Sequence, residues 1–418
     1  MNRLRQFWHY ARKVFDLPSR LRAVRDHRRD PDVPTWAVTG SLFLGALLRL
    51  PSFLQIQLES RRPGWKRLLG YPNEITDDRL DYVTERYYLD DLRRVLVDTN
   101  QTLKRNKALD AAKIQGLLIC SIDANEQFHS RARCCSDCCQ RQITLTNAQG
   151  QSQEVTEYYH RQVYAQIQGP NFSVVLDLEP IRAGEEEAAA ALRMLGRIRR
   201  LYGPRFFDVV SLDAWYATGP TIKGIQRLGW GVVTVLKQER YEIYQEATAL
   251  MAQQKPMHWK WEDRQVDLWE VKHLPFTDEA IGPMRVVQAH ERWEEVQQVG
   301  GVRARKPMES HWRWLASREL DGYSAQTICL IGHRRWGIEN HTFNELTQYY
   351  HLEHCPHHQP IAILAWLLIL VLAFNLFELF VRVHGKLWRQ GKVTLQDLCR
   401  QLDHGLARWE ELQPLWSG

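Results

Sequence analysis

The chain has 418 residues, enough for two or three domains, and 44% of them are hydrophobic, which is ordinary for a globular protein. Lys and Arg outnumber Asp and Glu by 55 to 49, a net charge of +6 that is compatible with a polyanionic partner without identifying one. With eight cysteines in so long a chain and no apolar segment after the N-terminal charges, a metal site or reduced thiols are favoured over a disulfide scaffold, and a cytoplasmic protein is predicted. The motifs of P-loop ATPases and H-E-x-x-H zinc proteases are absent.

Residues 1–110 have the composition of a small helical DNA-binding domain, and leucines recur at helical spacing over residues 77–103. The first 29 residues hold nine basic side chains and only two acids, Asp16 and Asp26. Such a cluster can lie along DNA phosphates, and it can equally be a solvated basic surface. The nine basic residues are Arg3, Arg5, Arg12, Lys13, Arg20, Arg22, Arg25, Arg28 and Arg29.

Residues 111–239 predict the first part of a catalytic core. Apolar runs predict strands, and amphipathic stretches between them predict helices. Three strands followed by helix, strand, helix and strand is the element order of a ribonuclease-H-like fold, an α/β class in which helices flank a mixed sheet. The expected strands are 117–123, 158–167, 172–178, 206–212 and 231–236, and the expected helices are 184–201 and 218–228.

Residues 240–320 interrupt this order with short alternating runs rich in tryptophan, which predict a β-rich insertion. Most of these tryptophans are expected to form the core of the insertion. A sharper alternative is that Trp259, Trp261 or Trp269 stacks on a base flipped out of DNA.

Residues 321–384 predict the second part of the core, and residues 385–418 predict a helical tail. A polar helix over 334–350 carries Glu339, and a strongly apolar helix follows. That second helix is long enough to span a membrane, but it contains Asn375 and Glu378, and polar residues are costly in a span. The pattern therefore favours a buried core helix over a membrane anchor, and no membrane partner is expected.

Three acids of this core form a candidate catalytic set. Asp123 ends the first apolar run and Asp213 ends the fourth, and in the predicted sheet these two strands are neighbours. Glu339, on the later helix, is expected to complete the set. Phosphoryl transfer on DNA uses two divalent cations, and Mg²⁺ prefers carboxylate oxygens. Arg335 precedes Glu339 by one helical turn, so it can either contact a phosphate or form an ordinary surface ion pair with Glu339.

In order and in strand context, these residues resemble the motifs of DDE insertion-sequence transposases of the retroviral-integrase-like superfamily. The second acid opens Asp-x-x-Tyr, here residues 213–216, and the third ends Arg-Trp-x-Ile-Glu, here residues 335–339, after a β-rich insertion. The resemblance covers residues 116–380 and implies that Asp123, Asp213 and Glu339 bind Mg²⁺ or Mn²⁺.

Two departures from the family pattern concern phosphate contacts. The family's tyrosine falls on Gly332 and its basic residue falls on Leu346, so these contacts are expected from other side chains. Their candidates are Arg334, Arg335, Lys237 and His341. Asp177, Glu179 and Asp208 are rival acids, ranked lower because their predicted positions are away from the central strand ends.

The resemblance implies a transposase that hydrolyses phosphodiester bonds at the ends of a mobile element and joins the freed 3′-OH to another strand. Its expected partners are double-stranded DNA, as terminal inverted repeats and target, and a second copy of the chain, at the bacterial nucleoid. The resemblance favours cut-and-paste transposition with a hairpin step. Two alternatives remain: a ribonuclease-H-fold nuclease without strand transfer, and a domesticated, non-catalytic DNA-binding protein.

A second constellation suggests zinc. Cys135 and Cys138 form a C-x-x-C pair between Cys134 and Cys139, and five His and Cys residues crowd into residues 351–358. Zinc takes four tetrahedral nitrogen or sulfur ligands, so one pair from each cluster makes a closed structural site, for which we select Cys135, Cys138, His354 and His358. The alternative is a set of reduced thiols beside a polar, histidine-rich turn.

Overall fold

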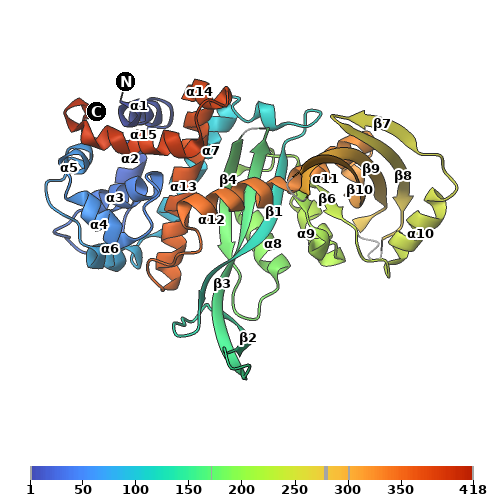
Figure 1. The fold of residues 1–418 in the computed structure, drawn as a ribbon, viewed down its shortest axis with the longest axis horizontal. Helices are drawn as coiled ribbons and strands as arrows, with labels where there is room; N and C mark the ends of the chain where they lie inside the picture. The colour runs from blue at the N-terminus through green and yellow to red at the C-terminus, as the bar shows by residue number, and fades with distance from the viewer. Residues whose placement is uncertain (1, 171, 277–280, 300–301, 417–418) are drawn as a thin grey trace. The chain divides into compact units, whose positions relative to one another are not determined.

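The computed structural model describes residues 2–170, 172–276, 281–299 and 302–416 (Figure 1). The chain forms two compact units. The first comprises Met1–Ala111, Ala124–Ala190 and Asn340–Gly418, and the second comprises Ala112–Asp123 and Ala191–Glu339. Strand β1 (Ile119–Ser130) passes from the second unit into the first just after Asp123.

The N-terminal part of the first unit is the expected helical region. Two of its helices begin where a polar side chain accepts a free backbone N–H: Thr76 accepts from Arg79 at 3.3 Å, and Ser52 accepts from Gln55 at 3.2 Å. Two aspartates in the first turn of α7 and two basic residues in its last turn complement the helix dipole. The helices are α1 (Arg3–Phe15), α2 (Leu17–Arg22), α3 (Thr35–Leu47), α4 (Phe53–Ser60), α5 (Pro63–Leu69), α6 (Asp77–Thr84) and α7 (Leu89–Arg105).

The strands of the first unit are antiparallel. The long strand β3 (Ser152–Gly169) pairs through its first half with β2 (Cys139–Thr146) and through its second half with β4 (Phe172–Pro180). The β2–β3 hairpin extends from the body of this unit (Figure 1). Strand β2 was not predicted, because its polar and largely exposed residues lack the apolar alternation of a half-buried strand. Four helices complete this unit: α12 (Asn344–Tyr350), α13 (Pro360–His384), α14 (Lys386–Arg389) and α15 (Leu395–Ala407).

Helix α13 has the length and hydropathy of a membrane span, but 89% of its most apolar stretch of 18 residues is buried within the protein. It packs on α3, α7 and β4. The Asn375 side chain accepts the N–H of Val175 and donates to its carbonyl, both at 2.8 Å. Since β4 pairs only with β3 among the described strands, Asn375 satisfies backbone groups that the sheet leaves unpaired at its edge. The prediction of a core helix is confirmed.

The second unit contains the parallel centre of the sheet. Strand β1 pairs in parallel with β5 (Val209–Leu212), which pairs in parallel with β6 (Gly231–Val235). All residues of β5 and β6 are buried, as expected for parallel strands covered on both faces. Helix α8 (Glu187–Tyr202) precedes β5 in the chain, and α9 (Gly219–Arg227) connects β5 to β6. With β3 next to β1 and β4 next to β3, this is the predicted ribonuclease-H-like mixed sheet.

The β-rich insertion is also confirmed, as a curved antiparallel sheet that joins the centre through pairing of β10 with β6 (Figure 1). Its elements are α10 (Glu242–Met251), β7 (Met257–Trp261), β8 (Arg264–Leu274), β9 (Met284–Val299) and β10 (Val302–Ser317). Helix α11 (Ala325–Arg335) follows the insertion and packs on β5, β6 and β8–β10.

The single helix predicted over 334–350 is wrong in detail. Helix α11 ends at Arg335, a π-helical turn runs from Ile338 to Phe343, and α12 begins only after it. Two residues, Trp336 and Gly337, lie between α11 and the π-helical turn, and glycine is a poor helix former. A π-helical turn re-aims side chains within a continuing helical path, and such turns are frequent at functional sites.

Gly332 allows α11 to approach the sheet closely. A Cβ atom at this position would lie 2.1 Å from Nε1 of Trp314, whose indole is fully buried. The tyrosine that the family motif has at this position would not fit, because the Trp314 side chain already fills the space. This contact explains the departure from the family motif at Gly332.

We expect Gly332→Ala to lower the free energy of unfolding by roughly 1–3 kcal/mol, because the added methyl must displace a buried indole or the helix itself. Urea unfolding followed by tryptophan fluorescence measures the change. Gly322→Ala is the matched control, since a Cβ there meets nothing within 4 Å. Equal stability of the two variants would contradict the tight packing of α11.

Candidate active site

Asp123 and Asp213 lie at the same level of neighbouring parallel strands. The register pairs Ser121 of β1 with Ser211 of β5, and each aspartate follows its serine by two residues. Parallel strands lie about 4.8 Å apart, so both carboxylates belong to one edge of the sheet. Strand β1 continues beyond Asp123, whereas β5 ends at Leu212, so the first acid is not at a strand end as predicted. The edge that carries both acids is therefore set by the end of β5, while β1 continues past it.

Arg335 joins the first and third acids within the second unit. Its Nη1 atom donates to Oδ2 of Asp123 at 2.9 Å and to Oε1 of Glu339 at 2.7 Å. The guanidinium side chain is 5% exposed, Asp123 is 16% exposed and Glu339 is 42% exposed. The predicted surface pair between Arg335 and Glu339 is therefore part of a three-residue ionic cluster, which ties the end of α11 to β1.

Asp213 is held by the loop that follows it. Its Oδ1 atom accepts the N–H of Trp215 at 2.7 Å, where the residue caps a short 3₁₀ turn, Ala214–Tyr216. The Asp213 carbonyl accepts the hydroxyl of Thr234 on β6 at 2.6 Å. These bonds fix the backbone of Asp213, and among the described residues only the Oδ1 atom of its carboxylate accepts a hydrogen bond.

The donor set suits a hard divalent cation, because all three side chains offer carboxylate oxygens. Among the described residues, these oxygens do not all gather within 4.8 Å of one another. The Arg335 guanidinium lies between Asp123 and Glu339 and neutralises part of their charge. A cation bound by all three acids therefore requires Arg335 to move or to share their oxygens.

Of the other predicted phosphate contacts, Lys237 and Arg334 lie on the same unit, whereas His341 lies in the first unit, with its Nε2 3.2 Å from Oε2 of Glu378. Lys237 is exposed and follows β6 by two residues, at the edge that carries Asp213. Arg334 is partly buried beside Arg335, and burial lowers the pKa of its guanidinium from its usual value. Trp215, next to Asp213, was not singled out from the sequence although it lies within Asp-x-x-Tyr, and its side chain is 74% exposed. Only the fold reveals that this indole is open to solvent.

The rival acids have structural partners. Asp177 and Glu179, on β4 in the first unit, are buried beside Arg93, at 3.4 Å and 4.0 Å from its guanidinium nitrogens. Asp208 precedes β5 at the opposite end of that strand, and its carboxylate accepts the N–H of Leu118 at 2.7 Å. Each of these carboxylates thus has a partner within the fold.

The tryptophans of the insertion form two groups. Trp259 stacks on Trp261 with ring centroids 5.9 Å apart, and Trp312 stacks on Trp314 at 6.1 Å; these four pack towards α11. Trp269 lies between Leu268 and Glu270 on β8, on the face opposite the core residue Leu268. The structure thus separates Trp269 from the other two predicted stacking residues.

His333 on α11 anchors this aromatic group. Its ring lies 4.9 Å from Trp261 and 5.2 Å from Trp314, and its Nε2 lies 2.5 Å from Oε1 of Glu291. Burial works to raise the pKa of Glu291, but the hydrogen bonds from His333 and Arg264 outweigh it and lower the pKa. A buried carboxylate thus holds the helix that carries Arg335.

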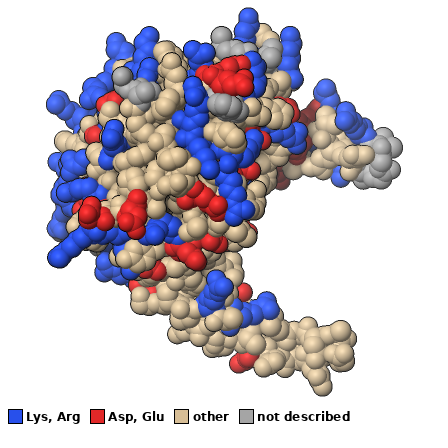
Figure 2. Space-filling model, turned by 90° about the vertical axis from the view of Figure 1, so that its left-hand side faces the viewer, with Lys and Arg blue, Asp and Glu red and all other residues tan. Residues whose placement is uncertain are grey.

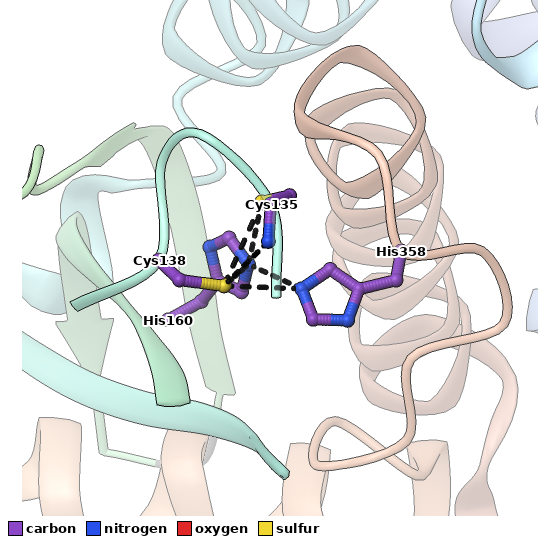
Figure 3. A group of neighbouring side chains, drawn as sticks. All are labelled: Cys135, Cys138, His160 and His358. Carbon is purple, nitrogen blue, oxygen red and sulfur yellow. Dashed lines mark hydrogen bonds between the residues drawn. The ribbon is translucent and has the colours of Figure 1, made fainter. Parts of the chain in front are cut away.

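Separately, the first unit brings four metal-ligand side chains together: Cys135, Cys138, His160 and His358 (Figure 3). Three of them are predicted zinc ligands, and His160 on β3 stands where His354 was expected. His160 was missed because nothing in a single histidine on a strand marks it as a ligand. Burial and the facing His358 lower the pKa of His160 to about 4, so its ring is neutral at pH 7.

A family model described as a transposase DDE domain matches residues 148–376. The matched region contains Asp213 and Glu339 and begins after Asp123. A search of curated proteins finds no match. Among solved structures, the chain is similar to the cryo-EM structure of the piggyBac transposase synaptic complex with hairpin DNA. That similarity has 12% sequence identity and a TM-score of 0.40, and it covers 98% of this chain and 81% of the other.

We expect Arg335→Gln to lower the free energy of unfolding by about 2 kcal/mol, because Asp123 and Glu339 lose the cation between them. Mg²⁺ or Mn²⁺ should raise the melting temperature of this variant more than that of the wild type. Differential scanning fluorimetry with and without metal measures both effects. Lys237→Gln, at an exposed position of the same unit, should change stability by less than about 0.5 kcal/mol. A metal response no larger than that of the wild type would refute the competition between Arg335 and metal.

Proposed function

Because the chain belongs to the transposase DDE domain family, it is an enzyme of DNA transposition, and we propose that its chemistry is carried by Asp123, Asp213 and Glu339. In this proposal the three carboxylates bind Mg²⁺ or Mn²⁺. The enzyme hydrolyses a phosphodiester bond at the end of a mobile element, and the freed 3′-OH then attacks a second phosphodiester, forming a new P–O bond as the 3′-oxygen of the attacked strand leaves. The observation that supports it most is the equal level of Asp123 on β1 and Asp213 directly after β5, with Glu339 tied to Asp123 through Arg335.

The residues of the site have distinct parts in this chemistry. Bound divalent cations would activate the attacking oxygen and stabilise the charge on the leaving oxygen. The carboxylates would hold and orient that centre from β1, from the cap of the 3₁₀ turn after β5 and from the π-helical turn. Arg335, when displaced from the acids, is positioned to contact a phosphate, and Arg334 and Lys237 supply further positive charge. The exposed indole of Trp215 offers a stacking surface for a base beside Asp213.

The proposed partners are double-stranded DNA, as terminal inverted repeats and target, and a second copy of the chain, at the nucleoid of a bacterial cell. We assign DNA binding to residues 1–110, residues 111–239 and 321–384 to the catalytic core, residues 240–320 to the insertion and residues 385–418 to the tail. Figure 2 shows Lys and Arg side chains over much of the face that carries the N-terminal helices. Such a surface suits a polyanion.

Not every N-terminal cation is available for that role. Arg25 forms a bidentate pair with Asp91, and Arg28 pairs with Asp26. By contrast, Arg5, His9 and Lys13 recur every four residues along one face of α1 and line a pocket with the end of α13. Arg5 and Lys13 are exposed and are the strongest candidates for phosphate contact.

We expect Asp123→Asn, Asp213→Asn and Glu339→Gln each to reduce metal-dependent cleavage by roughly 10³-fold or more, because each removes a negatively charged ligand. The assay uses a labelled duplex that carries the element's end, and gel-shift titration verifies that binding is retained. Joined products distinguish strand transfer from simple nuclease activity. Glu239→Gln, an exposed acid after β6, should cleave normally. Full activity of Asp213→Asn or Glu339→Gln would show that the catalytic assignment is wrong.

The double variant Arg5→Gln/Lys13→Gln should bind duplex DNA more weakly, with the slope of log K against log salt reduced by up to about 2, because each lost phosphate contact removes about 0.9. Fluorescence anisotropy across a salt series measures the slope. Arg25→Gln is the control, since its charge is already neutralised by Asp91. If Arg25→Gln weakens binding as much as the double variant, the α1 face is not the specific contact.

A further inference from the structure

The cysteine–histidine group of the first unit draws on three segments far apart in the sequence. Cys135 and Cys138 lie in the connection between β1 and β2, His160 lies on β3, and His358 lies in the connection between α12 and α13. Figure 3 shows the four side chains pointing toward one common centre. We propose that these four residues bind a structural Zn²⁺ ion, whether or not the carboxylate site performs the function proposed above.

The distances between ligand atoms, 3.1–3.7 Å, are close to those of a tetrahedral zinc site. With Zn–S bonds of about 2.3 Å and Zn–N bonds of about 2.05 Å, tetrahedral angles place the ligand atoms roughly 3.3–3.8 Å apart. The sulfur atoms of Cys135 and Cys138 are 3.7 Å apart, and each lies 3.4 Å from Nε2 of His160. Nε2 of His358 lies 3.2 Å from the Cys138 sulfur and 3.1 Å from Nε2 of His160. Both imidazoles thus present the same nitrogen to the centre.

The backbone around the C-x-x-C pair is arranged to support thiolate ligands. The Cys138 N–H donates to the carbonyl of Cys135 at 3.2 Å, which closes a turn and places both sulfurs on one side. The N–H of Cys135 donates to the Cys138 sulfur, also at 3.2 Å. Hydrogen bonds from outside the ligand set orient metal ligands and stabilise their charge.

The neighbouring cysteines are directed elsewhere. Cys134 is exposed, and the sulfur of Cys139 lies 3.9 Å from the carbonyl of Ile181. A disulfide between Cys135 and Cys138 does not explain the group, because both are free and a disulfide bond is about 2.05 Å long. Nor does a disulfide account for two histidines that converge on the same point.

Zinc at this position would fix the start of the buried helix α13. His358 immediately precedes Gln359, whose side chain caps that helix by accepting the N–H of Ala362 at 2.9 Å. The ion would join this point to β3 and to the base of the β2–β3 hairpin. Because such a site does not exist in the unfolded chain, its binding free energy would stabilise the fold, and a cross-link between distant segments restricts the unfolded chain most.

The first test is the zinc content of the full-length protein, measured by inductively coupled plasma mass spectrometry after exhaustive dialysis. We expect one zinc per chain in the wild type and none in Cys138→Ser or His160→Ala. Cys134→Ser and His354→Ala, which alter residues outside the group, should retain it. Asp213→Asn should also retain it, which separates this ion from any zinc bound at the carboxylates.

A second readout keeps the test decisive where a ligand variant folds poorly. Co²⁺ added to metal-depleted wild type should give the absorption of a tetrahedral centre with thiolate ligands, and a chelator should lower the melting temperature of wild type and of His354→Ala alike. Wild type that binds neither Zn²⁺ nor Co²⁺ would overturn the proposal. So would loss of zinc in His354→Ala together with its retention in His160→Ala, since that result assigns a different fourth ligand.

Discussion

The parallel backbone ladder between β1 and β5 is the constraint on which the candidate active site depends. Because Ser121 is level with Ser211, two aspartates far apart in sequence reach the same edge of the sheet. The pairing of β5 with β6 brings Lys237 to that edge as well. A shift of one residue in the register would turn one carboxylate to the other face. The fully buried strands β5 and β6 oppose such a shift, since it would disturb their packing on both faces.

The third acid depends on a different contact, the docking of α11 on the curved sheet. Gly332 lets the helix approach Trp314, and the Glu291–His333 pair ties the same helix to β9. Arg335 at its end then reaches both Asp123 and Glu339. Because a guanidinium offsets part of the charge of two carboxylates, the acids can be held close together before any metal arrives. The site is thereby compatible with a stable fold and with later binding of cations.

Polar side chains in apolar surroundings have separate tasks in the two units. In the first, Asn375 completes the hydrogen bonds of an edge strand, and Arg93 neutralises Asp177 and Glu179. These partners explain why a helix as apolar as α13 belongs to a core and why those acids serve the fold. Asp213 differs from these acids. Among the hydrogen bonds of the described residues, its carboxylate accepts only the N–H of Trp215, in the loop that follows it.

The sequence by itself determined the strand and helix order, the β-rich insertion and the burial of α13, because apolar periodicity reports which faces leave water. It also placed the motif residues Asp123, Asp213 and Glu339 on elements that the fold does contain. Tertiary structure alone decided what those residues contact: the three-residue cluster at Arg335, the break of the helix after it, and the meeting of His160 with Cys135 and Cys138. The local sequence pattern does not indicate which distant segments come into contact. The metal-ligand position of a lone histidine on β3 and the polar strand β2 were therefore not predicted.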